Sequence, residues 1–166
     1  MREKYLDECG IIQQNCTYTA EAHHLMAASA KRKAFWLEVI PAIIAAVTST
    51  LVVAKIAGEW LLPFTVLSAA ISAIAAVLNP NKIYQDHLGA ARNFTTIKHD
   101  ARYLRESQST KISDDVLAVT VDHLHQRYNE ILKSTSPTDG KFFDKARRIV
   151  QAGIHEPDKD GSGKIK

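Results

Sequence analysis

Two long apolar blocks stand out in the hydropathy pattern, in the middle of an otherwise polar chain of 166 residues. Across residues 39–81 only Lys55 and Glu59 are charged, whereas charges are frequent on both sides. The block after Glu59 is long enough to span a membrane without any charged residue. The earlier block is long enough if it starts near Phe35 and if Lys55 extends toward water along its aliphatic stem. About 20 helical residues cross the ~30 Å hydrocarbon core of a bilayer. The pattern therefore predicts transmembrane helices at about 35–55 and 60–80.

The connection between the blocks is so short that the two helices must run antiparallel, as a hairpin. Phe35 and Trp36 open the first helix and Trp60 opens the second, which is typical of aromatic residues at membrane interfaces. The alternative is a buried hairpin in a water-soluble bundle, but the polar residues inside the blocks are only Ser, Thr and Asn and form no polar stripe. A cleaved signal peptide is disfavoured because a long polar, patterned segment precedes the first block.

Outside the blocks, apolar residues recur at spacings of three and four, which is typical of helices that pack along a seam. Two seams flank the hairpin, a third follows a good helix start at Ser113, and a short last helix ends at Gly153. The seams are Tyr5, Cys9, Ile12, Cys16, Thr19, His23, Met26 and Ala30; Ile83, His87, Ala90, Phe94, Ile97, Ala101 and Leu104; Leu117, Val121, Leu124, Tyr128 and Ile131; and Phe142, Phe143, Ala146, Ile149 and Val150. Because the hairpin brings its two ends together, we expect the first two seams to pack on each other.

The sequence thus predicts an all-α membrane protein, in which a two-helix transmembrane hairpin is extended by cytosolic helices packed as a stalk or bundle. The expected divisions are a cytosolic N-terminal helix (1–34), the hairpin (35–81), a cytosolic helical region (82–153) and a flexible tail (154–166).

Charged residues predict the orientation of the hairpin. Lys31, Arg32, Lys33, Lys82, Arg92 and Lys98 flank the spans, and only Lys55 lies in the turn. By the positive-inside rule both termini are cytoplasmic and the tip of the hairpin faces outward. The formal net charge of +3 and the small size of the basic cluster at residues 145–148 predict no nucleic-acid partner.

Candidate chemistry is sparse. Cys9 and Cys16 lie two helical turns apart, too far for a disulfide, and we expect reduced thiols in a helix seam. The histidines do not have metal-ligand spacing. His87 lies on a seam beside Asp86 and near the membrane and could titrate near neutrality, but a satisfied packing histidine is the favoured interpretation. The tail holds half of a calcium-binding loop, without the glutamate that completes it. We therefore expect no metal, no cofactor and no enzymatic activity.

Small residues recur within both spans, and they are the candidate functional residues. Rows of small residues let helices approach closely in lipid, within one hairpin or between subunits. One hairpin cannot enclose water, whereas an oligomer lined by hydroxyl and amide side chains could. The candidates for helix packing or pore lining are Ala42, Ala46, Thr48, Ser49, Thr50, Ser68, Ser72, Ala76 and Asn79.

Pro80 follows Asn79 at the end of the second span. Proline lacks the N–H that would continue the helix, so a kink or restart is expected there, with Asn79 as the cap of a new helix. We regard Pro80 and the nearby seam residue His87 as a candidate gating joint. The alternative is an ordinary helix-start proline at the headgroup level.

The architecture, the exit segment LNPNK and the following HLGAARNFTTIKHDARYL resemble the SLATT domain, a two-span module of bacterial conflict systems, over about residues 1–133. The resemblance implies an oligomeric effector that permeabilises the bacterial inner membrane during phage infection and so kills or arrests the cell. It also implies a trigger from a separately encoded sensor protein or a nucleotide signal. The alternative is a membrane anchor, without a pore, that scaffolds or regulates a cytosolic partner.

Overall fold

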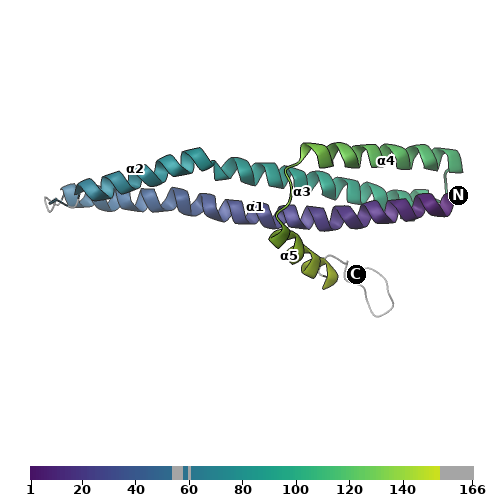
Figure 1. Ribbon diagram of the computed structural model, residues 1–166, viewed down its shortest axis with the longest axis horizontal. Coiled ribbons are helices and arrows are strands. Elements are labelled where there is room, and N and C mark those ends of the chain that lie inside the picture. The colour runs from purple at the N-terminus through teal and green to yellow at the C-terminus, as the bar shows by residue number, and fades with distance from the viewer. Residues whose placement is uncertain (54–57, 60, 154–166) are drawn as a thin grey trace. The chain divides into compact units, whose positions relative to one another are not determined.

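Helices make up the regular structure of the chain. The computed structural model describes residues 1–53, 58–59 and 61–153, and these ranges contain no strand (Figure 1). The elements are α1 (Arg2–Val53), α2 (Leu61–Leu78), α3 (Pro80–Tyr103), the π-helical turn η1 (Leu104–Gln108), α4 (Asp114–Ser134) and α5 (Gly140–Gln151). The predicted all-α class is confirmed. The expected flexible tail, the half calcium loop, Lys55 and Trp60 lie outside the described residues.

The chain forms two compact units. The first, here called the hairpin unit, is Ala27–Gln85. The second, here called the bundle unit, consists of Met1–Met26 and the described residues from Asp86 onward. Helix α1 continues without a break across the expected division between residues 34 and 35. The change from cytosol to membrane at that division stays a prediction.

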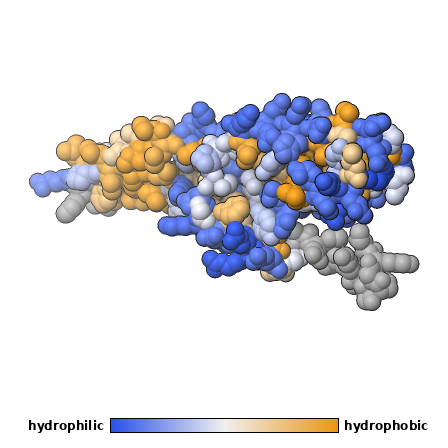
Figure 2. Space-filling view, turned by 45° about the vertical axis from the view of Figure 1, so that its right-hand side comes forward, coloured by the Kyte–Doolittle hydropathy of each residue, from blue (hydrophilic) through white to orange (hydrophobic). Residues whose placement is uncertain are grey.

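The hairpin unit exposes its apolar residues. Helix α1 and the helical segment Leu61–Gln108 each contain a stretch long and apolar enough to cross a membrane, and almost none of either stretch is buried within the protein. Figure 2 shows these side chains as a continuous hydrophobic surface. Large exposed members include Ile43, Val47, Val52, Leu62, Val66 and Val77. Because the described helices leave this surface uncovered, the hairpin does not have the burial expected of a soluble core.

The least exposed residues of the two spans recur at steps of three, four or seven, as they do where helices pack along one stripe. Apart from the half-buried Val39, which lies off the stripe, they are Ala34, Leu37, Pro41, Ile44, Thr48 and Leu51 on α1, and Leu61, Ser68, Ile71 and Ala75 on α2. The Ser68 hydroxyl donates to the Pro41 carbonyl oxygen at 3.3 Å. The contact within the hairpin therefore uses residues of mixed size.

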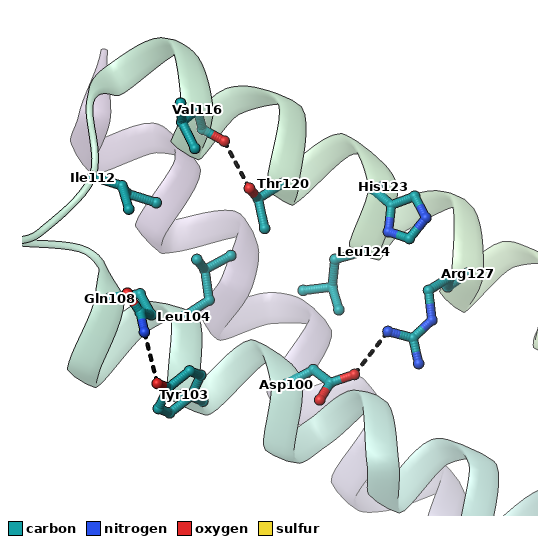
Figure 3. Close-up of a pocket in the computed structure, with 10 residues that line it drawn as sticks. All are labelled: Asp100, Tyr103, Leu104, Gln108, Ile112, Val116, Thr120, His123, Leu124 and Arg127. Carbon is teal, nitrogen blue, oxygen red and sulfur yellow. Dashed lines mark hydrogen bonds and ion pairs between the residues drawn. The ribbon is translucent and has the colours of Figure 1, made fainter.

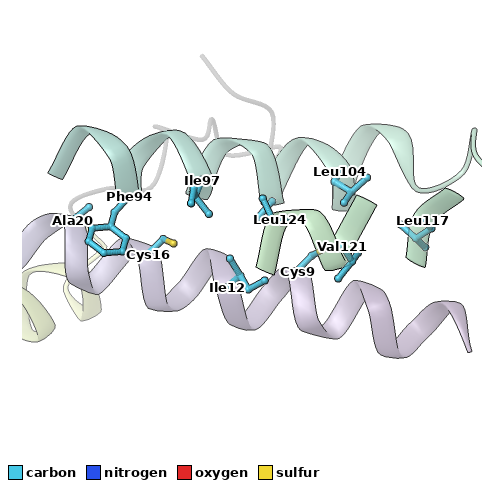
Figure 4. Packing of buried hydrophobic residues seen from close by; sticks show 11 residues of the cluster. Cys9, Ile12, Cys16, Ala20, Phe94, Ile97, Leu104, Leu117, Val121 and Leu124 are labelled. Carbon is cyan, nitrogen blue, oxygen red and sulfur yellow. The ribbon is translucent and has the colours of Figure 1, made fainter. Parts of the chain in front are cut away.

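The core of the bundle unit lies between α1, α3 and α4 (Figure 4). Its buried members are Cys9, Ile12, Cys16, Ala20, Phe94, Ile97, Ala101, Leu104, Leu117, Val121 and Leu124. Most of the predicted seam positions are buried, which confirms the use of three helical seams. Apolar burial of this kind contributes about 25 cal/mol per Å² removed from water.

Three seam positions were predicted wrongly. Thr19 and Met26 are only half-buried, while the neighbouring Ala20 and Ala27 are buried. A straight α-helix drifts by about 20° per heptad relative to a seven-residue repeat, so burial on this side of the seam passes to the next residue, while the row of Cys9, Cys16, His23 and Ala30 stays buried. Ile83 is 45% exposed and lies in the hairpin unit, outside the bundle core.

The predicted start of α4 at Ser113 and the predicted end of α5 near Gly153 are both present. Ser113 caps α4, because its hydroxyl oxygen accepts from the Val116 N–H at 3.5 Å. Asp139 caps α5 by accepting from the Lys141 N–H at 2.9 Å. Gly153, after α5, has a φ of 73°, a left-handed conformation that favours glycine.

Candidate functional site

The predicted small-residue row of α1 lies on an exposed face of the hairpin unit. Ala42, Ala46 and Thr50 are exposed, and so are Ser72 and Ala76 on α2. These residues alternate with the seam positions that α1 and α2 use to contact each other. The row is therefore left free by the hairpin contact.

Four hydroxyl residues and two alanines line a groove of about 310 Å³ between α1 and α2: Ala45, Thr48, Ser49, Thr65, Ser68 and Ala69. Each hydroxyl donates to a main-chain carbonyl. The Thr48 hydroxyl donates to Ile44 at 2.7 Å, that of Ser49 to Ala45 at 2.8 Å, and that of Thr65 to Leu62 at 2.9 Å. A lipid environment can accommodate this groove, because no hydroxyl donor is left without a partner, while oxygen lone pairs remain as acceptors.

The groove brings together three predicted lining residues, Thr48, Ser49 and Ser68, and adds Thr65, which the sequence analysis missed. The spacing of Thr65 and Ser68, three residues apart on one helix, was the signal that could have found it. Ser72 is exposed on another part of α2, and its hydroxyl donates to the Ser68 carbonyl at 2.9 Å. Asn79 lies beyond the end of α2, in the joint described next.

The expected break between α2 and α3 is present at Asn79. Its φ of 40° is left-handed, which asparagine tolerates better than most residues. The Asn79 side-chain oxygen accepts from the Lys82 N–H at 3.2 Å, and its main-chain oxygen accepts from the Lys82 and Ile83 N–H groups at 3.0 and 3.3 Å. Asn79 therefore caps α3, and Pro80 occupies its first position, where a missing N–H costs nothing to α3.

A second cavity, of about 220 Å³, adjoins this break. It is lined by Ala34, Leu37, Glu38, Ala75, Ala76, Asn79, Pro80 and Asn81. The Asn81 amide nitrogen donates to a Glu38 carboxylate oxygen at 2.7 Å. The sequence analysis overlooked Glu38 and also Pro41, a buried proline inside α1.

Two buried histidines form a pair in the bundle unit. The Nδ1 atoms of His23 on α1 and His87 on α3 lie 3.1 Å apart, so one ring donates an N–H to the other. The His23 ring also stacks on Phe94, with centroids 5.8 Å apart. Both histidines were placed on seams by their spacing, but their pairing was not predicted because it depends on the register of α1 against α3.

Burial lowers the pKa of both imidazoles. The pKa of His23 falls to about 4, because of burial first and then the proximity of His87 and His24. Burial also lowers the pKa of His87, although Asp86 opposes the shift. Both shifts favour the neutral imidazole, and His87 is the buried, hydrogen-bonded packing residue that its seam position favoured.

A pocket of about 460 Å³ lies between α3, η1 and α4 in the bundle unit (Figure 3). Leu104 and Leu124 form its buried floor, and the Arg127 guanidinium pairs with the Asp100 carboxylate at 2.8 Å. The π-helical turn brings Tyr103 and Gln108 onto one face, where the amide donates to the phenol oxygen at 2.6 Å. The sequence analysis missed this pocket, because hydrophobic spacing does not indicate a π-helical turn.

Cys9 and Cys16 are buried free thiols, as their seam positions predicted. Burial raises the pKa of both thiols, that of Cys16 to about 12. Across the described ranges, no three His, Cys, Asp or Glu side chains cluster in a way that could hold a metal ion.

Comparison with known proteins gives a match to one family. The family model for the SMODS and SLOG-associating 2TM effector domain, family 4, matches residues 4–154. The match extends past the segment in which the sequence resemblance was seen and includes α5. No curated protein and no solved structure matches the chain significantly.

Proposed function

The chain belongs to the SMODS and SLOG-associating 2TM effector domain family, and on this basis we propose that it is an oligomeric effector that permeabilises the bacterial inner membrane. In this proposal the bundle unit lies in the cytoplasm with both termini. A separately encoded sensor or a nucleotide signal acts on it during phage infection. Loss of the membrane potential then arrests or kills the cell before phage are released.

The observation that carries the proposal is the small-residue surface left free by the hairpin contact. Ala42, Ala46 and Thr50 are exposed on α1. In lipid, where apolar contact alone gives no net driving force, close approach over small residues is what holds helices together. A second copy of the hairpin could approach closely over this row.

The hydroxyl groove supports the second part of the proposal, a weakly polar conduction path. Its oxygen lone pairs can accept hydrogen bonds from water, and its donors are already bonded to main-chain carbonyls. Copies arranged around such surfaces could enclose a path for ions. Of the remaining predicted lining residues, Ser72 would lie farther along α2, whereas Asn79 lies beyond its end, in the joint.

Induced expression in a bacterial host tests this function. We expect a membrane-potential dye to report depolarisation, and Ala46→Leu or Ser72→Leu to abolish it while the protein still inserts, because added methylenes favour insertion but block close approach. Val47→Leu is the matched control, since Val47 is an exposed apolar residue outside the row. Depolarisation that is unchanged in both small-residue variants would remove the small-residue rows of α1 and α2 from the mechanism.

One observation favours the alternative, a membrane anchor without a pore. Helix α5 exposes Lys141, Lys145, Arg147 and Arg148, a basic surface suited to an acidic cytosolic partner. An anchor would leave the membrane potential unchanged on induction at any expression level. The same dye measurement therefore separates the two functions.

A further inference from the structure

The cavity beside the α2–α3 break in the hairpin unit is rich in hydrogen-bond acceptors. We propose that it binds a small cationic group, and that the group is the primary ammonium of a phospholipid headgroup such as phosphatidylethanolamine. This inference rests on the membrane location of the proposed function, but it does not depend on pore formation.

Two prolines create the acceptors. Proline has no N–H, so Pro41 cannot donate to the carbonyl of Leu37, and Pro80 cannot donate to the carbonyl of Ala76. Leu37 and Ala76 both line the same cavity, although they belong to different helices. Two carbonyl groups that lack their α-helical donors therefore belong to residues that line one cavity.

Glu38 adds a negative charge to this site. Its side chain is exposed, and one carboxylate oxygen accepts from the Asn81 amide at 2.7 Å. None of the ion pairs among the described residues includes Glu38. The carboxylate therefore keeps lone pairs and an uncompensated charge, and a hydrogen bond from a cation would be charge-assisted.

The depth of the site selects the source of the cation. Phe35 and Trp36, within one turn of Glu38, are exposed aromatic residues of the kind found at the headgroup level. A primary ammonium has three N–H donors, which match the Glu38 carboxylate and the carbonyls of Leu37 and Ala76. A trimethylammonium headgroup has the same charge but no N–H, so it cannot make these bonds.

Binding there would join α1 to the Asn79–Pro80 break. The lipid would contact Leu37 and Glu38 on one helix and Ala76 on the other, and would hold the joint in the conformation that the structure shows. The composition of the membrane would thereby set how readily the joint moves.

The test uses the purified 166-residue chain in detergent micelles, to which phosphatidylethanolamine or phosphatidylcholine with identical acyl chains is added. Native mass spectrometry measures lipid retention. We expect the ethanolamine lipid to bind about tenfold more tightly than the choline lipid, since hydrogen bonds to a charged partner are among the strongest. A second experiment, without lipid, compares the thermal stability of the protein in sodium chloride with that in choline chloride.

Two variants weaken the site, one by removing its charge and the other by occupying one of its acceptors. Glu38→Gln keeps an acceptor for Asn81 but loses the charge, and Pro41→Ala supplies the N–H that the Leu37 carbonyl lacks. We expect Glu38→Gln to abolish the tenfold preference and Pro41→Ala to reduce it several-fold. The matched controls are Glu59→Gln, at the other end of the hairpin, and Pro63→Ala, in the first turn of α2 where the missing N–H frees no helical carbonyl.

The outcomes separate the possible sources. One outcome is a gain in stability in sodium that Glu38→Gln loses, with no preference for the ethanolamine lipid. This outcome would support the cation site but assign it to a free metal ion. Equal lipid binding with no sodium response overturns the proposal, as does a preference that survives in both acceptor variants. Because binding is measured in micelles, a failure to depolarise cells would count against the pore and leave the lipid site standing.

Discussion

At the scale of single residues, the His23–His87 pair is the most unusual contact of the bundle unit. Two neutral imidazoles satisfy each other with one N–H and one lone pair, in a position where neither is exposed by more than 7%. Two protonated rings would place like charges 3.1 Å apart in a buried site. The pair therefore stabilises the packing of α1 against α3 only while it carries at most one proton.

We expect the stability of the bundle unit to fall as the pH falls from about 6.5 toward about 4. The unfolded histidine binds a proton near its ordinary pKa of 6.5, whereas the folded His23 resists protonation until about pH 4, so acid favours the unfolded state. The loss should be on the order of 3 kcal/mol over this window. Thermal unfolding followed by circular dichroism from pH 7.5 to 4.5 measures it.

The control for this pH dependence is a histidine elsewhere on the surface. His23→Phe, which can still stack on Phe94, should flatten the acid limb of the curve, whereas replacement of the exposed His123 by Asn should leave it unchanged. The groups that face the pair, His24 on α1 and Asp86 on α3, remain in both variants. If the acid limb persists in His23→Phe, carboxylates elsewhere control the acid sensitivity.

At the scale of elements, the joint between α2 and α3 gives a prediction about gating. Replacing Pro80 with Ala restores an N–H that can donate to the Ala76 carbonyl, so α2 and α3 can join into one stiffer helix. We expect the threshold for depolarisation to change more than expression or insertion does. Graded induction with a membrane-potential dye, with and without the cognate trigger, measures the threshold.

Asn79→Gly is the companion variant for the joint. Glycine adopts the left-handed φ of Asn79 without strain and keeps the break, so its induction curve should follow that of the wild type. Superimposable curves for Pro80→Ala and the wild type would instead mean that Pro80 merely begins α3 and takes no part in gating.

The elements show which parts of the structure are predictable from the sequence. The seams around Cys9, Phe94 and Leu117 followed from local spacing, because each helix buries the face on which its apolar residues recur. Ser113 and Asn79 predicted helix starts, because their side-chain oxygens can accept hydrogen bonds from the first N–H groups of a helix. Asn79 and Pro80 also indicated the break, because a missing N–H is a property of the residue itself.

The candidate sites were less predictable, because they depend on contacts between helices. The pairing of His23 with His87 requires the register of α1 against α3, which spacing within one helix does not contain. The contact between Glu38 and Asn81 likewise joins residues 43 positions apart. Pro41 was visible within an apolar segment, but its effect on the Leu37 carbonyl matters only once the cavity around that carbonyl is known.

At the scale of the whole molecule, the distribution of charge predicts the topology. Six Lys and Arg residues flank the spans and one lies in the turn, so we expect both termini in the cytoplasm. Green fluorescent protein fused at either terminus should fluoresce, and alkaline phosphatase fused at either terminus should be inactive. Insertion of the phosphatase between Gly58 and Glu59 should activate it, and an active phosphatase at a terminus would contradict the topology.

The chemistry of the two native cysteines decides how assembly can be observed. Thiol reagents attack the thiolate, and burial raises the pKa of Cys9 and Cys16, so both should remain unmodified while the protein is folded. A cysteine placed on the exposed row, as in Ala46→Cys, can then carry the only spin label on each chain. Distances between copies become measurable by electron paramagnetic resonance without altering two residues of the core.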